Sequence, residues 1–129
     1  MNQNHPPVFV VIHPDGTVAW GADLQAAKSA MGPYGTDSGF AGHPEISRLR
    51  LMMSDVALVM RDEFPTNVPA GRVLETLTGV RPSDSIQELR GPVALYYYDP
   101  TNMWDSSRPM TADEQRAMDE ALATAGCNR

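Results

Sequence analysis

With 129 residues and an apolar fraction of 42 %, the chain is long enough to bury the core of one domain without a metal or a disulfide. Acidic residues outnumber lysine and arginine by 16 to 10, which disfavours nucleic-acid binding, because proteins that bind nucleic acids need cations to displace condensed counterions. The single thiol, Cys127, excludes an internal disulfide and indicates a reducing compartment.

Residues 1–7 are polar, end in two prolines and have neither the cationic start nor the apolar stretch of a secretory signal. We therefore expect a disordered lead-in there. No stretch of the sequence approaches the ~20 apolar residues that span a bilayer. These observations predict a soluble cytoplasmic protein with one domain over residues 8–126 and a tail over residues 127–129.

The first structured element predicted by the sequence is a hairpin. Residues 8–12 are apolar and predict a strand, and residues 17–20 predict a second, shorter strand. The four residues between them have turn chemistry, because Pro14 fixes φ and Gly16 can adopt a positive φ.

Apolar side chains at helical spacing then predict a helix over residues 23–31, which ends at the Gly-Pro pair of positions 32 and 33. The following segment, residues 32–45, contains four glycines and two prolines and has no usable hydrophobic period. Loops of this length inside a small domain are usually functional or disordered, so this segment is the first candidate for a binding site.

Two further strands are predicted over residues 46–53 and 56–61, joined as a hairpin by residues 54–55. Alternation in the first arm predicts one buried face and one partly cationic, solvated face. The second arm is apolar on both faces, so we expect it to lie further inside the sheet.

Two helices carry cap signals. Asn67 can cap a helix over residues 67–78, which has Pro69 in its first turn and Gly79 after its end. Residues 111–114 match a capping box, which predicts a helix over residues 111–125 that stops at Gly126. Residues 83–90 predict either one more helical turn or a lead into the next strand.

Residues 93–98, Val-Ala-Leu-Tyr-Tyr-Tyr, lie between two proline-marked breaks and carry no charge. A run of this length is too short for a stable helix and predicts a strand near the middle of the sheet. The other elements are then its neighbours and covers, and the segment after it, residues 99–109, is expected to be a long loop.

The order of these elements resembles a family of small phage, plasmid and actinobacterial proteins described as a domain of unknown function. The matching positions are Asn67 and Ala70 at a helix opening, Gly91 before the central strand, and residues 111–122 in the last helix. The family's glycine pair and its Asn-Glu-Glu-Gly stretch are missing, and residues 61–64 stand in place of the latter. The resemblance implies a phage or mobile-element origin and brings no activity.

Few residues suggest catalytic chemistry. His5, His13 and His43 each lie beside a proline without a second ligand at metal spacing, so no metal and no cofactor are expected. Phosphate-loop and hydrolase-elbow motifs do not occur in the sequence. Asp62, Glu63 and Asp99 follow strand ends, where carboxylates either act on a ligand or simply keep the strand exits soluble.

Aromatic and methionine side chains are more informative. Tyr96 and Tyr98 should project from one face of their strand and Tyr97 from the other. They are either core residues with paired hydroxyls or part of a contact surface, since aromatic residues and methionine anchor protein interfaces. The candidate partner-binding residues are Tyr34, Phe40, Met52, Tyr96, Tyr98, Met103 and Trp104.

These predictions combine into an α+β fold: a mixed or antiparallel sheet of about four to five strands, with three helices packed mainly on one face. The leading functional hypothesis is a non-enzymatic phage or mobile-element protein that binds, and can inhibit, a host or phage protein through the aromatic and methionine surface. One alternative is a nucleotide-like ligand binder or enzyme that uses residues 32–45 as a lid over the acidic strand ends. Another is an acidic decoy for a nucleic-acid-binding protein, which requires its carboxylates to gather on one surface.

Overall fold

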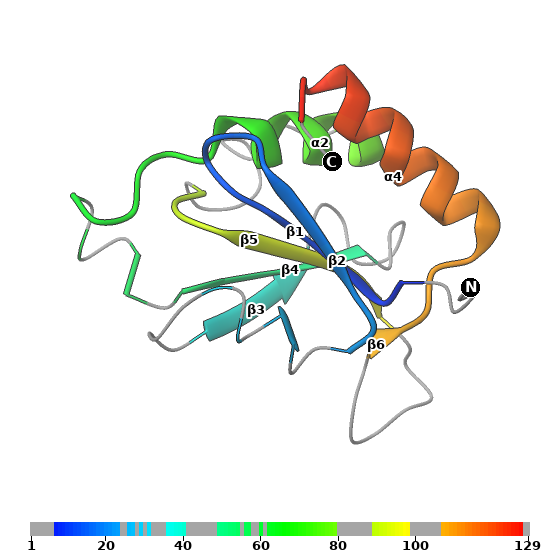
Figure 1. The fold of residues 1–129 in the computed structure, drawn as a ribbon, viewed down its shortest axis with the longest axis horizontal. Coiled ribbons are helices and arrows are strands. Elements are labelled where there is room, and N and C mark those ends of the chain that lie inside the picture. The colour runs from blue at the N-terminus through cyan, green and yellow to red at the C-terminus, as the bar shows by residue number, and fades with distance from the viewer. Residues whose placement is uncertain are drawn as a thin grey trace.

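The fold is α+β, with one antiparallel sheet covered by helices (Figure 1). The computed structural model describes residues 7–23, 26–27, 29, 31, 36–40, 49–54, 56–57, 60, 62–79, 89–98 and 107–127, and for residues 36–40, 98 and 107 it describes the backbone alone. No helix within these ranges has the length and apolarity that a membrane crossing requires.

The sheet is built around the strand that the sequence placed at its centre. The strands are β1 (Phe9–Ile12), β2 (Val18–Gly21), β3 (Thr36–Phe40), β4 (Leu49–Ser54), β5 (Val93–Tyr98) and β6 (Ser107–Arg108). Their order is β2-β1-β5-β4-β3, every pair is antiparallel, and β6 pairs with the end of β5. The prediction for residues 93–98 is therefore confirmed, as is the hairpin formed by β1 and β2.

Helices α2 (Val68–Thr78) and α4 (Ala112–Thr124) begin and end where their cap signals predicted. Asn67 caps α2, and Gly79 ends it in the left-handed region at φ 75°. Thr111 and Glu114 form the complete capping box of α4. Both helices lie over the same face of the sheet (Figure 1).

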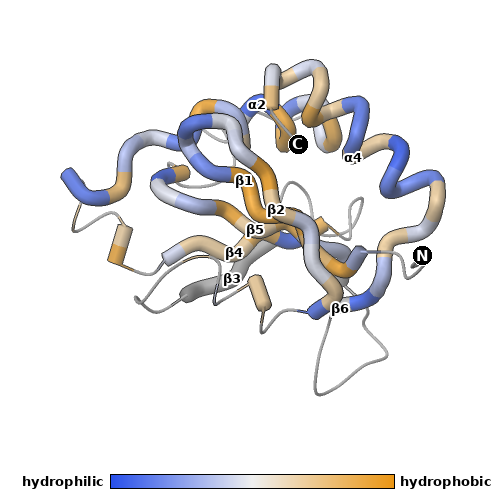
Figure 2. Tube along the Cα trace, viewed as in Figure 1, coloured by the Kyte–Doolittle hydropathy of each residue, from blue (hydrophilic) through white to orange (hydrophobic). Residues whose placement is uncertain are grey.

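Alternation along the strands divides the core between two faces. Val10 and Ile12 of β1 face α2 and α4, together with Leu95 of β5. Helix α4 adds Met118 and Leu122, which are both fully buried. Figure 2 shows apolar residues concentrated along β1 and in β5, while polar residues recur along α4. Burial of these apolar faces is the main force that holds the helices to the sheet.

The opposite face of the sheet carries a second apolar cluster. Phe9, Val11, Met52, Ala94 and Tyr96 pack there with Ala27 and Met31. The solvated face that we predicted for residues 46–53 is therefore wrong at Met52, which is 4 % exposed, because residues from the segment after β2 cover it.

The prediction of three helices on one face needs correction. Two full helices, α2 and α4, cover one face, whereas in the predicted third helix the described residues Ala26, Ala27 and Ser29 are helical. Backbone bonds from Ala27 to Asp23 and from Met31 to Ala27 have helical spacing. This short segment packs on the opposite face of the sheet, so a helical pattern in the sequence did not reveal which face it would cover.

The predicted hairpin of residues 46–53 and 56–61 is also wrong. Strand β4 pairs with β3 and β5, not with the segment that follows it. After Ser54 the chain turns, and the N–H of Met60 donates to the carbonyl of Val56 at 2.9 Å, a helical spacing. A short apolar run does not distinguish strand from helix, and here the pairing of β4 was already taken by other strands.

Part of the segment predicted as a structureless loop is a strand. Residues 36–40 form β3 and pair with β4 from Thr36 opposite Ser54 to Phe40 opposite Arg50. In the predicted loop 99–109, residues 107–108 form β6. The lead-in 1–6, the remaining positions of segment 32–45 and most of residues 83–90 lie outside the described residues.

Candidate functional site

A hollow of about 370 Å³, widely open to solvent, is lined by the turn between β1 and β2 and by the residues just before β5. Three segments far apart in the sequence form it, and each contributes a proline. We call it the proline hollow and define it by nine residues: His13, Pro14, Asp15, Thr17, Glu63, Phe64, Pro65, Gly91 and Pro92. Its volume falls within the range of small-molecule and side-chain pockets.

The first wall of the proline hollow is the turn that joins β1 and β2. The N–H of Gly16 donates to the carbonyl of His13, and the N–H of His13 donates to the carbonyl of Thr17, each at 2.9 Å. Asp15 Oδ1 accepts from the Thr17 N–H at 2.9 Å and from its hydroxyl at 2.7 Å. The bond from the Thr17 N–H is the largest cause that holds the pKa of the exposed Asp15 carboxyl below its ordinary value, and the bond from the Thr17 hydroxyl is the second. Asp15 is therefore a fixed negative charge at the rim.

The second and third walls pair with each other through their backbones. The N–H of Gly91 donates to the carbonyl of Pro65, and the N–H of Asn67 donates to the carbonyl of Leu89, both at 2.9 Å. Gly91 has φ 70°, and a Cβ at this position would lie 2.5 Å from Phe64 Cδ1. Glycine is therefore required here both for the backbone conformation and for the close approach of the Phe64 ring.

Asn67 fastens all three walls to the fold. Its Oδ1 accepts from the N–H of Ala70 at 3.0 Å, and its Nδ2 donates to the carbonyl of Ile12 at 2.8 Å and to that of Gly91 at 2.7 Å. The side chain is 1 % exposed, and these three bonds use its acceptor and both of its donor hydrogens. Asn67 thus joins the end of β1, the start of α2 and the residues before β5.

The lining of the proline hollow is mixed in character. Phe64 and the three prolines provide apolar surface, while His13, Asp15 and Glu63 provide ionisable groups. Within the described residues, no group of three or more His, Cys, Asp or Glu side chains is arranged to hold a metal ion. The lining therefore combines apolar surface with ionisable groups, and the guanidinium of Arg90 donates to the carbonyl of Phe64 at 2.8 Å.

Exposed apolar side chains follow the second wall of the proline hollow in the sequence. Val68, the first residue of α2, follows Pro65 by three positions and is 50 % exposed, and Pro65 is exposed as well. Large apolar side chains at this exposure have no role in the core of the monomer. Pro65 and Val68 are therefore exposed apolar residues at and just after the second wall of the hollow.

The structure places the predicted partner-binding residues at very different depths. Met52 and Tyr96 are buried at 4 % and 2 % exposure, which resolves the alternative for Tyr96 in favour of the core and removes both from the accessible surface. Phe40 lies in β3 and Tyr98 in β5, where the backbone alone is described. The other predicted residues, Tyr34, Met103 and Trp104, lie outside the described residues.

Of the predicted acidic and histidine candidates, Glu63 and His13 are brought together in the proline hollow. Asp62 is exposed beside Glu63, whereas Asp99, His5 and His43 lie outside the described residues. Sequence reasoning did not identify Asp15, Pro65 or Pro92 as site residues. The sequence signal that could have identified this site is a proline close to a strand end, since Pro14 follows β1 and Pro92 precedes β5.

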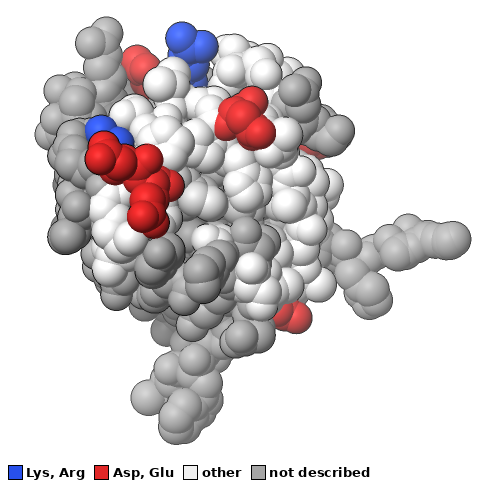
Figure 3. All heavy atoms as spheres, turned by 60° about the vertical axis from the view of Figure 1, so that its left-hand side comes forward, with Lys and Arg blue, Asp and Glu red and all other residues white. Residues whose placement is uncertain are grey.

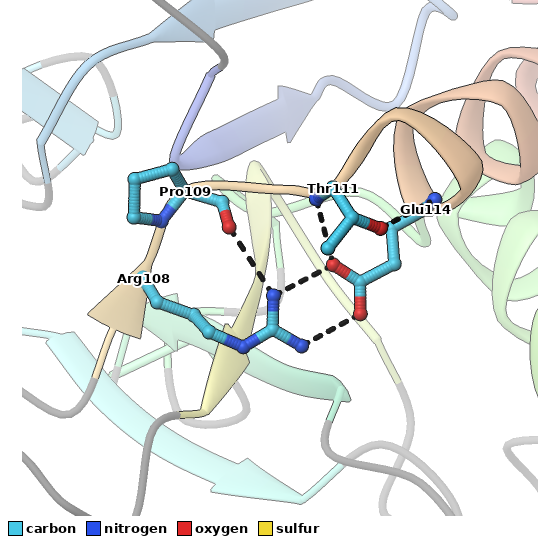
Figure 4. Close-up of polar contacts among 4 residues, drawn as sticks. All are labelled: Arg108, Pro109, Thr111 and Glu114. Carbon is cyan, nitrogen blue, oxygen red and sulfur yellow. Dashed lines mark hydrogen bonds and ion pairs between the residues drawn. The ribbon is translucent and has the colours of Figure 1, made fainter.

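A second polar cluster joins β5, β6 and α4 (Figure 4). Arg108 donates to both carboxylate oxygens of Glu114, at 2.7 and 2.6 Å, and to the carbonyl of Pro109 at 3.2 Å. Its guanidinium lies 5.3 Å from the ring centroid of Tyr97. Glu114 Oε1 also accepts from the N–H of Thr111 at 2.9 Å. Every group in Figure 4 already has a partner, so the cluster acts as a clamp between the sheet and α4.

This clamp shifts two pKa values. The hydrogen bond from Arg108 is the largest cause that holds the pKa of Glu114 below its ordinary value. Burial, followed by the nearby Glu114 carboxylate, raises the pKa of Tyr97 to about 12. Both shifts favour the protonation states that the clamp uses, an ionised carboxylate and a neutral phenol.

The decoy hypothesis depends on how the acidic residues are distributed. Figure 3 shows acidic side chains in several separate groups on the viewed face, with uncharged surface between them in the described part. The carboxylates of the described residues on that face do not form the continuous row that would imitate nucleic-acid phosphates.

Compared with protein-family models, with curated proteins and with solved structures, the chain matches none of them. The family resemblance drawn from the sequence therefore remains a prediction. The three positions Asn67, Ala70 and Gly91 that carried it have a structural role of their own, because two side-chain hydrogen bonds of Asn67 join them.

Proposed function

We propose that this chain is a non-enzymatic recognition protein that binds another protein through the proline hollow and the adjoining Val68. The observation that carries the proposal is the proline hollow, a concave surface of about 370 Å³ with apolar and acidic walls. The phage or mobile-element origin, and inhibition of a host or phage partner, belong to the same proposal and rest on the resemblance in element order.

Rigidity supports a role in binding. Asn67 holds Ile12 and Gly91 by hydrogen bonds at 2.8 and 2.7 Å, so the backbone beside the hollow is fixed before a partner arrives. A preorganised surface loses less conformational entropy on binding than a mobile one. The walls can therefore present Asp15 and Glu63 to a partner without first ordering a loop.

The mixture of groups supports a protein as the ligand. Protein interfaces combine a small apolar centre with a polar rim, and specific ones bury about 1,600 Å² in total. The proline hollow is smaller than such an interface and would form its centre, with Val68 and Pro65 as neighbouring contacts. The buried Met52 and Tyr96 have no part in this surface, in contrast to the expectation from the sequence.

Affinity capture with matched variants tests the proposal. Pro65→Tyr places bulk in the hollow while its backbone carbonyl still accepts from Gly91, and Val68→Ser removes the exposed apolar group. Ala123→Ser, at an exposed position near the end of α4, is the control. We expect a stoichiometric partner that is lost with the first two variants and retained with the control.

A different pattern of loss would contradict the assignment. If Tyr34→Ala or Trp104→Ala removes the partner while Pro65→Tyr and Val68→Ser leave it bound, recognition uses Tyr34 or Trp104 and not the hollow. Circular dichroism of each variant is the control that checks whether the fold is intact.

A small-ligand function is the second candidate, because the volume of the proline hollow suits a small molecule and Glu63 comes from the predicted acidic pair. For this function residues 32–45 were predicted to act as a lid, but five of them form β3 at the far edge of the sheet from β1. A thermal-shift screen of nucleotides, amines and metals tests it. Stabilisation by one compound, abolished by Pro65→Tyr, would favour this function over protein binding.

A further inference from the structure

We propose that the partner protein is recognised as an extended segment that joins the outer edge of β2 as a further strand. This inference rests on the proposed function, because β2 begins directly after Thr17, a residue in the first wall of the proline hollow. It names the form in which the partner is bound: a backbone in the β conformation with apolar side chains at alternate positions.

The backbone of β2 presents hydrogen-bonding groups on the side away from β1. Among the strands that the structure describes, β2 lies at one end of the order and pairs with β1 alone (Figure 1). The carbonyls of Thr17 and Gly21 accept from residues that flank β1, each at 2.9 Å. Backbone groups alternate in direction along a strand, so the N–H and carbonyl groups of Val18 and Trp20 point to the outer edge. A row of donors and acceptors of this kind is a template for another strand.

The outer edge of β2 lacks two features that keep other strands away. Native sheets guard their edges with charged side chains or proline, among other means. Residues 17–22 read Thr-Val-Ala-Trp-Gly-Ala and contain neither. Every residue of β2 is only half-buried, so the strand reaches the surface of the protein. The strand at the other end of the order, β3, carries Asp37, which makes β2 the better template of the two.

The side chains of β2 define what the added strand carries. Val18 and Trp20 lie on the face that α2 and α4 cover, where both are partly buried against the core. Ala19 lies on the opposite face. Side chains opposite each other on paired strands share a face, so apolar residues two positions apart on the partner would contact Val18 and Trp20. Tryptophan is among the residues that contribute most to binding at protein interfaces.

Charge argues against a second copy of this chain as the added strand. The symmetric antiparallel pairing that uses the outward groups of both Val18 and Trp20 sets each of them opposite the other. In that register the exposed acids that flank β2, Asp15 and Asp23, also fall opposite each other, once at each end. Like charges directly opposite are destabilising, and each chain carries a net charge of -6. The occupant is therefore a segment of a different protein, without acidic residues at those two positions.

Amide hydrogen exchange of the free protein tests whether the edge is open. The N–H of Ala19 points to β1, whereas those of Val18 and Trp20 point outward. Relative to an unstructured peptide, we expect the two outward amides to be protected at least tenfold less than the Ala19 amide. Two-dimensional NMR follows each signal, and sedimentation equilibrium gives the oligomeric state. Equal protection of the three amides, or a dimer that Val18→Pro dissociates, would overturn the inference.

A random peptide array supplies the probe for strand addition. One peptide that binds the wild-type protein is synthesised as a series, with a single N-methyl group at each successive position. An added strand turns every second N–H toward β2, so N-methylation should weaken binding at least fivefold at alternate positions and much less at the positions between them. Weakening without this alternation would overturn the inference.

Matched variants of β2 connect the selected peptides to the edge. Val18→Pro removes the outward N–H and leaves the bonds to β1 in place, because proline is tolerated on the open side of an edge strand. Val18→Thr keeps both the branched shape and the N–H and is the control. We expect the peptides to lose at least fivefold in affinity with the first variant and to keep their affinity with the second. If circular dichroism shows that Val18→Pro does not fold, the N-methyl series still decides.

Comparison with Pro65→Tyr separates this inference from the proposed function. Peptides that are lost with both Val18→Pro and Pro65→Tyr support both. Peptides that are lost with Pro65→Tyr and still bind Val18→Pro refute strand addition and leave the proposed function standing. The reverse pattern supports strand addition and refutes recognition through the hollow. An array with no peptide that depends on Val18 also refutes the inference.

Discussion

Replacement of Asn67 gives the sharpest test of how the fold is held together. The side chain makes three hydrogen bonds, one as the cap of α2 and two as the donor to Ile12 and Gly91. In Asn67→Ala the lost cap costs about 1 kcal/mol. Each lost donor costs about 1 kcal/mol or more, because a buried carbonyl then has no partner from this side chain. The expected loss is about 3–4 kcal/mol in the free energy of unfolding.

This loss is large for a domain of this size. Native domains are stable by about 5–15 kcal/mol, so the Asn67→Ala variant should lose between about a fifth and about four fifths of its stability. The midpoint of thermal unfolding should fall by roughly 10 °C. Urea unfolding followed by circular dichroism measures the loss, and an unchanged m value shows that the two-state comparison holds.

Asn67→Asp separates the two roles of the side chain. The carboxylate keeps the cap acceptor for Ala70, and its charge is favourable at a helix amino end. It has no donor for Ile12 or Gly91, however, and sets oxygen against two carbonyl oxygens. We expect this variant to be as unstable as Asn67→Ala or more so at pH 7, whereas Thr111→Ala at the cap of α4 should cost about 1 kcal/mol.

The reasoning would be refuted by a stable aspartate variant. If Asn67→Asp unfolds at the same urea concentration as the wild type, the two donor bonds contribute nothing, and Asn67 is a helix cap alone. If Thr111→Ala costs as much as Asn67→Ala, the added cost assigned to the two buried carbonyls is wrong.

Further predictions concern the clamp and the core. The Arg108 hydrogen bond lowers the pKa of Glu114 in the folded protein. The stability from this bond is therefore complete above the ordinary pKa of 4.5 and is lost as the pH falls through the lower pKa of the folded state. The urea midpoint of Glu114→Gln should change less with acid than that of the wild type. The pKa of Tyr97 is raised from 10 to about 12, so its contribution is complete below pH 10 and is lost as the pH rises toward 12. In an ultraviolet titration, Tyr97→Phe should remove a late-ionising phenol. Met118→Ala should lower the free energy of unfolding by about 2–5 kcal/mol, and Met118→Leu by less than about 1.5 kcal/mol, in urea unfolding.

Local signals in the sequence predicted the elements whose ends depend on local chemistry. The Thr111 and Glu114 capping box lies within four consecutive residues, and the cap of α2 lies between Asn67 and Ala70. The central strand was equally clear, because six uncharged residues stand between two breaks. In each case the hydrogen bonds or the burial that fix the element involve residues close together in the chain, or a strongly apolar run.

Elements defined by distant partners were missed for a physical reason. Strand β3, with the sequence Thr-Asp-Ser-Gly-Phe, has little strand propensity, and its pairing comes from backbone groups of β4. Residues 56–60 have the composition of a strand, yet both neighbours of β4 are other strands. Propensity therefore favoured the wrong partner for β4, because it carries no information about which edges remain open.

The candidate site could be predicted only in fragments. Its walls come from residues 13–17, 63–65 and 91–92, and nothing in their separate sequences shows that they meet. Glu63 was singled out for its charge and His13 for its imidazole, but the hollow depends equally on the prolines. The surface expected from aromatic content failed at Tyr96, because a tyrosine in a central strand is as useful in the core as at an interface.

One side chain links the stability of the fold to the shape of the hollow. Asn67 donates to the carbonyl of Ile12, just before the first wall, and to that of Gly91 in the third wall, while its own N–H pairs with Leu89. The second wall, residues 63–65, enters α2 through the same residue. A change that loosens Asn67 therefore weakens the attachment of all three walls to the fold, although each wall keeps backbone hydrogen bonds of its own. A hollow built on separate loops could lose one wall and keep the others, and its affinity would then be independent of fold stability, whereas here the two properties share the same hydrogen bonds.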